Sequence, residues 1–180
     1  MGLTTNGFIA GVIGGVVMNA INLAAYYILN ITKIRFLDWS SIIFLGRTPN
    51  NSAEVAYALF IQFLWSGLLG VIFNYLMHYV LSKEYILNGI LYSFFMSFTF
   101  RGFAVAFEIP FLYAPSLLTS IANTSSVFIW GVVVSLLLKS LNNTENLREG
   151  TGNRAEVNGE GILSEKSWFK IHFPKRNNVK

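Results

Sequence analysis

The chain has 180 residues, of which 53% are hydrophobic and only 12% are charged. Soluble domains carry about 25% charged residues, so this composition excludes an ordinary soluble protein and indicates an integral membrane protein. The net charge is +4 and most charged residues lie after Leu138, which favours anionic lipid headgroups over nucleic acid as a partner. Cysteine is absent, and this excludes disulfides and cysteine metal sites.

Four apolar segments are long enough to cross a bilayer as helices. They cover about residues 8–30, 54–81, 86–107 and 116–138. The sequence therefore predicts an all-α fold, a polytopic bundle of four transmembrane helices within residues 1–141. Residues 142–180 are polar and basic, and they predict a largely disordered tail.

An even number of spans places both termini on the same side of the membrane. The basic residues of the tail favour the cytoplasm for that side under the positive-inside rule. We therefore expect a multi-pass protein of the cell membrane, in contact with the lipid bilayer, with both termini in the cytoplasm.

Small residues recur at every fourth position in the first three predicted helices. This spacing places them on one helix face and lets a neighbouring backbone approach closely. The predicted helix-packing residues are Gly7, Gly11, Gly15, Ser66, Gly70, Ser93 and Ser97. Such faces predict packing within the bundle, or assembly into a homo-oligomer or with a membrane protein partner.

The connection from residue 31 to residue 52 is the longest between the predicted spans. Its apolar part, residues 42–45, is too short to cross the membrane and predicts a segment lying at the interface. Trp39 and the flanking arginines are typical anchors at that depth. The alternative is a gate or lid over a site.

Each predicted span carries a polar or charged side chain at a similar depth. A rise of about 1.5 Å per residue places these side chains roughly 4–8 Å from the helix midpoints, toward the first and third loops. The four residues are Asn22, Gln62, Arg101 and Asn123. They predict a polar layer that is also the candidate ligand-binding site.

Arg101 requires a partner, because a charge at membrane depth is costly unless it is paired or hydrated. The candidate ion-pair partners are Glu54, Glu108 and Asp38. A structural ion pair is one interpretation of Arg101. The others are a small cavity in which Arg101 binds an anionic group, and snorkelling of the side chain to the interface.

The tail ends in a mixture of aromatic and basic residues. The candidate membrane-surface residues are Trp168, Phe169, Lys170, Lys175 and Arg176. Such a mixture can stack on single-stranded nucleic acid, but adsorption onto anionic headgroups uses the same residues and needs no other partner. We therefore expect nucleic acid not to be a partner.

Motifs of known enzymes are absent from the sequence. There is no His-Glu-x-x-His, no Gly-x-Ser-x-Gly and no phosphate-binding loop. His78 falls near the membrane face opposite the polar layer, too far to activate a serine there. We expect no catalytic residues, no metal site and no cofactor.

One stretch of the sequence resembles a known group. Glycines from Gly11 to Gly15 lead into Asn19-Ala20-Ile21-Asn22 and Tyr26-Tyr27, and the stretch closes with residues 32–39, Thr-Lys-Ile-Arg-Phe-Leu-Asp-Trp. This order resembles small four-helix integral membrane proteins of endospore-forming bacteria. The resemblance covers about residues 7–140 and implies a helical bundle in a bacterial cytoplasmic membrane, without an assigned activity.

Three functions remain open from the sequence. The leading hypothesis is a non-enzymatic protein that assembles with itself or a membrane partner through the small-residue faces. The alternative is a small transport or channel component with a polar, anion-binding site around Arg101; four helices are few for a complete transporter, so it would need an oligomer or partner. The third is a substrate-binding subunit of a vitamin importer, although such subunits usually have about six helices.

Overall fold

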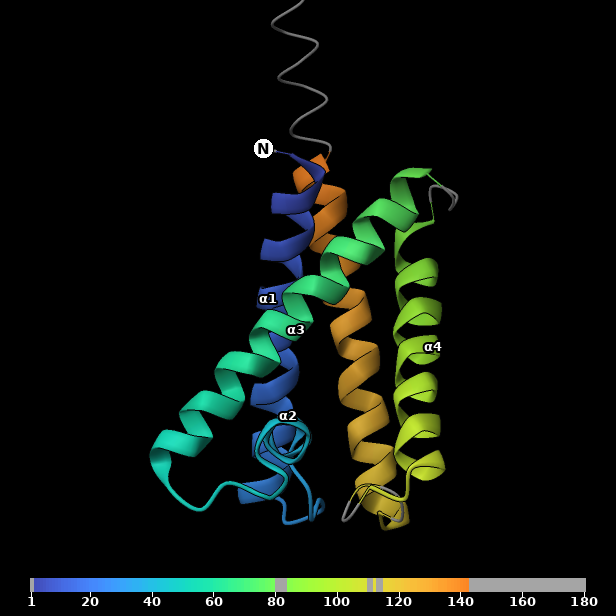
Figure 1. Ribbon diagram of the computed structural model, residues 1–180. Coiled ribbons are helices and arrows are strands. Elements are labelled where there is room, and N and C mark those ends of the chain that lie inside the picture. The colour runs from blue at the N-terminus through green and yellow to red at the C-terminus, as the bar shows by residue number, and fades with distance from the viewer. Residues whose placement is uncertain (1, 80–83, 110–111, 113–114, 143–180) are drawn as a thin grey trace, which may run out of the picture. The chain divides into compact units, whose positions relative to one another are not determined.

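The computed structural model describes residues 2–79, 84–109, 112 and 115–142. All regular secondary structure in these residues is helical, which confirms the predicted all-α fold. The helices are α1 (Leu3–Tyr27), α2 (Phe36–Leu45), α3 (Ser52–Tyr79), α4 (Tyr85–Ala106) and a last helix, Leu117–Asn142 (Figure 1). The chain divides into two units after Leu141, and the predicted membrane-surface residues of the tail lie outside the described residues.

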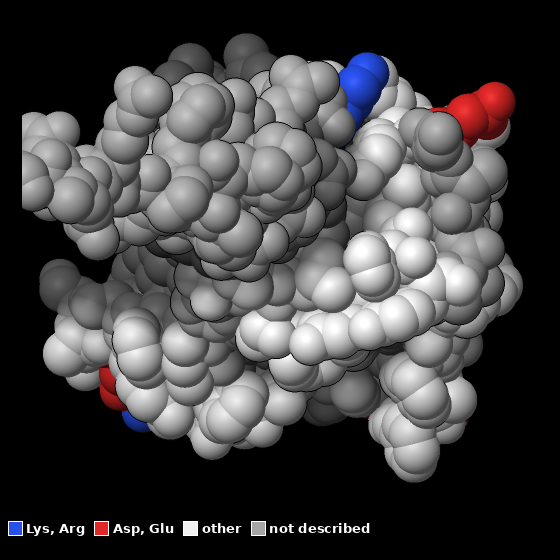
Figure 2. Space-filling view, turned by 90° about the horizontal axis from the view of Figure 1, so that it is seen from above, with Lys and Arg blue, Asp and Glu red and all other residues white. Residues whose placement is uncertain are grey.

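Four of these helices are long and apolar enough to cross a membrane: α1, α3, α4 and the last helix. The protein is therefore a multi-pass membrane protein. The start of α1 and the end of the last helix lie at the same end of the bundle (Figure 1). Seen from that end, charged groups of the described residues are visible at the edge of the molecule (Figure 2). Which end faces the cytoplasm remains a prediction.

The ends of the spans are set by local backbone chemistry. Helix α1 ends at Tyr27, before Asn30 adopts a left-handed conformation with φ 52°, a conformation that Asn tolerates better than most residues. Ser116 caps the last helix, because its Oγ accepts the backbone N–H of Thr119 at 3.3 Å. Compared with the predicted spans, α1 starts earlier, at Leu3, and the last helix extends further, to Asn142.

The predicted interfacial segment, residues 42–45, forms the last part of helix α2, which begins at Phe36. Its first turn is closed by a reciprocal cap, in which Asp38 Oδ2 accepts the backbone N–H of Arg35 at 2.7 Å and the Asp38 N–H donates to the carbonyl of Arg35 at 3.0 Å. Gly46 ends the helix at φ 72°, a left-handed conformation that glycine adopts without steric cost.

Close packing of α1 on α3 depends on glycine. A Cβ added at Gly7 would lie 2.7 Å from Cα of Val71, and one added at Gly11 would meet the carbonyl oxygen of Ser66. A Cβ added at Gly70 would in turn meet the carbonyl oxygen of Gly7. The predicted small-residue faces of the first two spans therefore pack on each other within one chain.

The last helix is tied to both α1 and α3 by a buried polar chain. Trp130 Nε1 donates to Ser66 Oγ at 2.7 Å, and Ser66 Oγ donates to the carbonyl of Gly11 at 2.7 Å. On its other side, the last helix packs against α4, where Gly131 faces Gly89. These contacts hold the four spans together on the side of the bundle where α1 begins.

Candidate functional site

A cavity of about 710 Å³ lies mainly between α2, α3, α4 and the last helix, and one residue of α1, Met18, also lines it. Its volume falls within the range of about 300–1,000 Å³ that is typical of small-molecule sites. Helix α3 crosses the bundle obliquely and diverges from α4 toward its own N-terminal end (Figure 1). The apolar lining includes Met18, Phe44, Leu69, Met96 and Val127.

The wall formed by α4 carries three of the predicted residues. Ser93, Ser97 and Arg101 recur at every fourth position and all line the cavity. Arg101 lies eight positions after Ser93, so at a rise of about 1.5 Å per residue the cavity extends about 12 Å along α4. Ser93 and Ser97 were predicted as helix-packing residues, and here they also line the cavity.

Two members of the predicted polar layer bond directly to each other. Asn22 is fully buried, and its Nδ2 donates to Asn123 Oδ1 at 2.8 Å. The Oδ1 of Asn22 accepts the backbone N–H of Phe36 at 2.9 Å. One side chain of α1 thus joins the first turn of α2 to the last helix. Asn123 lines the cavity, whereas Asn22 lies behind it.

Gln62 belongs to the same cavity but not to the same hydrogen-bonded pair. Its Oε1 accepts a hydrogen bond from Ser40 Oγ at 2.5 Å, which joins α3 to α2. Both residues line the cavity. The structure therefore brings Gln62, Arg101 and Asn123 to one cavity, with Asn22 as a supporting residue.

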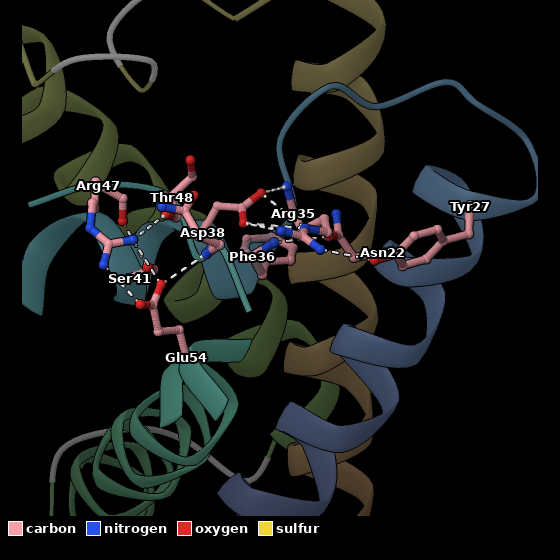
Figure 3. A network of polar contacts seen from close by, with 10 residues as sticks. Asn22, Tyr27, Arg35, Phe36, Asp38, Ser41, Arg47, Thr48 and Glu54 are labelled. Carbon is pink, nitrogen blue, oxygen red and sulfur yellow. Dashed lines mark hydrogen bonds and ion pairs between the residues drawn. The ribbon is translucent and has the colours of Figure 1, made fainter. Parts of the chain in front are cut away.

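The candidate partners of Arg101 are placed elsewhere. Asp38 bonds Arg35 at 2.8 Å, and Glu54 bonds Arg47 at 2.8 Å (Figure 3). Within the described part of the chain, neither Arg101 nor Glu108 has an ion pair. The prediction that Asp38 or Glu54 neutralises Arg101 is therefore wrong: each carboxylate lies nearer in sequence to another arginine, at one end of α2.

The Arg35–Asp38 pair fixes the start of α2 and is largely buried. Arg35 also donates to Tyr27 Oη at 2.9 Å and lies 5.2 Å from the ring centre of Tyr26. Burial acts to lower the pKa of Arg35, but the hydrogen bonds and charge of Asp38 outweigh it, so the pKa is raised above its ordinary value. Arg35 therefore remains charged and anchored to α1.

The Arg47–Glu54 pair connects the end of α2 to the start of α3. The two guanidinium nitrogens of Arg47 each bond one oxygen of Glu54, both at 2.8 Å. These hydrogen bonds and the carboxylate charge raise the pKa of Arg47. The pair is solvent-exposed, and exposed ion pairs contribute little to stability. Its main effect is to set the path of the loop.

Helix α2 supplies lining residues that sequence reasoning did not assign to a site. Phe36, Trp39 and Ser40 all face the cavity. The short apolar helix was recognisable from its length and composition, and a lid over a site was one of the two interpretations. Which residues of α2 meet the cavity depends on its docking by Asn22 and Arg35, which no local pattern reveals.

Comparisons with protein families, with curated proteins and with solved structures give no match for this chain. The resemblance to small membrane proteins of endospore-forming bacteria therefore stays a prediction.

Proposed function

We propose that this protein is a non-enzymatic membrane component that binds a small molecule inside its helical bundle, as the binding part of a transport system. The observation that carries the proposal is the cavity of about 710 Å³, which is lined mainly by α2, α3, α4 and the last helix. A mostly apolar cavity with a few convergent polar groups is the usual form of a small-molecule site.

The lining residues support binding rather than catalysis. Among the described residues that line the cavity there is no His, Asp, Glu or Lys. General acid–base catalysis most often uses one of these side chains within hydrogen-bond reach of the substrate. The guanidinium of Arg101 can hold and orient a ligand, but it cannot exchange a proton at ordinary pH.

Assembly through the small-residue faces has less support. Gly7 and Gly11 already pack on α3 of the same chain, and Gly89 packs on the last helix. An oligomer or a membrane partner would therefore have to use other surfaces. Four spans are few for a complete transporter, so we propose that such a partner completes the transport pathway.

Ligand binding can be tested by quenching of tryptophan fluorescence, because Trp65 and Trp130 line the cavity. The protein, reconstituted in phosphatidylcholine nanodiscs, is titrated with a brominated dodecyl probe, either the alcohol or the carboxylate. We expect a saturable component of quenching with at least one probe, in addition to the linear background from probe dissolved in the bilayer.

Filling the cavity should remove the saturable component. The double variant Ser97→Leu with Thr124→Leu places bulk into the cavity from α4 and from the last helix, since both residues line it. The control is Gly102→Leu, at an α4 position where an added Cβ meets nothing within 4 Å. Absence of a saturable component with both probes in the wild-type protein would refute the proposed function.

A further inference from the structure

The polar lining of the cavity offers hydrogen-bond donors in excess of acceptors. The backbone N–H of Phe36 can only donate, so Asn22 must present Oδ1 to it and Nδ2 to Asn123. Asn123 then accepts through Oδ1, and its own amino group has no partner among the residues that the structure describes. The orientation of both amides is thus fixed by one backbone group.

Gln62, on α3, also lines the cavity with a free amino group. Its Oε1 is engaged by Ser40, and its amino group has no partner within the described ranges. Arg101 adds a guanidinium, a group with five N–H donors and no acceptor. It has no hydrogen bond or ion pair to any described residue. Asn123, Gln62 and Arg101 therefore present free donors to the cavity, and the buried Nε1 of Trp39, another lining residue, also has no partner among the described residues.

The charge of the described lining is purely positive. Arg101 is the one ionisable side chain among the described residues that line the cavity, and none of these residues carries a carboxylate. A lone cation at membrane depth is unfavourable until an anion or water meets it. Charge and free donors together select a ligand group that is negatively charged and rich in acceptor oxygens.

The other end of the cavity offers no free donors of this kind. Trp130 Nε1 is taken up by Ser66 Oγ, and Ser93 Oγ donates to the carbonyl of Ile90 at 2.9 Å. Around them lie Leu69, Met96 and Val127. Arg101 is close to the C-terminal end of α4 and Ser93 lies near its middle. The cavity therefore runs from a charged end near one membrane face to an apolar end near the midplane.

From this gradient we infer that the ligand is a single-chain anionic amphiphile, an acid group on an apolar chain. The inference rests on the proposed function and specifies the chemistry of its ligand. The acid group, a carboxylate or a phosphate ester, bonds Arg101 together with the amino groups of Gln62 and Asn123. The apolar chain extends along α4 toward the midplane, in the direction that a lipid chain takes within one leaflet.

The decisive experiment compares bromo-dodecanoate with bromo-dodecanol in neutral phosphatidylcholine nanodiscs, at a pH where the acid is ionised. The two probes share a chain and differ in the head. We expect the carboxylate to bind at least about tenfold more tightly, the lower end of the effect of a charge-assisted hydrogen bond. Arg101→Gln should abolish this preference, and a circular-dichroism spectrum and thermal unfolding temperature like those of the wild type show that the variant is folded.

Two further variants separate Arg101 from charge in general. Arg101→Lys keeps the charge but loses the fork of donors, so it should retain only part of the preference. Arg47→Gln removes an exposed arginine that is paired with Glu54, and it should leave the preference intact. Loss of the preference in Arg47→Gln as well would assign it to the general surface charge and overturn the inference.

Competition identifies the source of the acid group. Displacement of bromo-dodecanoate by unlabelled dodecanoate alone supports a free acid, and displacement by phosphatidylglycerol in the nanodisc supports a bilayer lipid. Displacement by acetate or inorganic phosphate at the same concentration would overturn the amphiphile. Equal binding of acid and alcohol with no effect of Arg101→Gln would refute the inference but leave the proposed function standing, whereas no saturable binding of either probe would refute both.

Discussion

Two alanine substitutions of helical glycines should differ in their effect on stability. At Gly11, an added Cβ meets the carbonyl oxygen of Ser66 and lies 2.9 Å from Cα of Gly67. At Gly102 it meets nothing within 4 Å. Both positions lie inside helices, in α1 and α4. The two variants therefore make the same chemical change and differ in what surrounds it.

The magnitude follows from two opposing contributions. Replacing glycine with alanine inside a helix stabilises it by about 1 kcal/mol, and this contribution is common to both variants. Overpacking against a fixed neighbour costs about 1–3 kcal/mol and applies only at Gly11, where the neighbour is backbone and cannot rotate away. We expect Gly102→Ala to be as stable as the wild type or more stable. Gly11→Ala should be less stable than Gly102→Ala by about 1–3 kcal/mol.

The assay is equilibrium unfolding in mixed micelles, where the free energy of unfolding is extrapolated from a denaturing-detergent titration followed by circular dichroism. The difference between the two variants isolates the packing contribution, because helix propensity cancels. Equal free energies of unfolding for Gly11→Ala and Gly102→Ala would show that α1 does not pack on α3 through its glycine strip, and would refute the arrangement of the bundle.

Three other perturbations follow from the same contacts. Asn22→Leu should destabilise the bundle, and a double-mutant cycle with Asn123→Leu, read from unfolding free energies, should give a coupling of about 0.6–1.7 kcal/mol; strict additivity would contradict the hydrogen bond. Asp38→Asn should lower the thermal unfolding temperature more than Glu54→Gln, because the Asp38 pair is buried and the Glu54 pair is exposed; the reverse order would contradict this burial. Reporters fused after Asn142 and between α2 and α3 should report opposite sides of the membrane, the first cytoplasmic, and an external first reporter would reverse the predicted orientation.

The sequence by itself determined the class of protein and its local elements. Long apolar segments predict spanning helices because every backbone polar group must be satisfied inside the segment when water is absent. The same argument does not apply to residues 42–45, an apolar part of the first loop that is too short to span and was predicted to lie at the interface; the structure shows that it ends the longer helix Phe36–Leu45. Spacing along a helix also placed Gly7 and Gly11 on one face, and the rise per residue placed Asn22 and Asn123 at one depth.

Only the tertiary structure decided which of these faces meet. The helical repeat cannot tell a glycine strip that packs within the chain from one that packs on a second copy, because both need the same small residues. Likewise, Arg101 had three acidic candidates in the sequence, but in the structure Asp38 pairs with Arg35 and Glu54 pairs with Arg47. Apolar side chains are equally suited to face lipid or to line a cavity, so the sequence does not reveal the cavity beside Arg101. That cavity depends on the divergence of α3 from α4, which is set by packing between segments distant in the sequence.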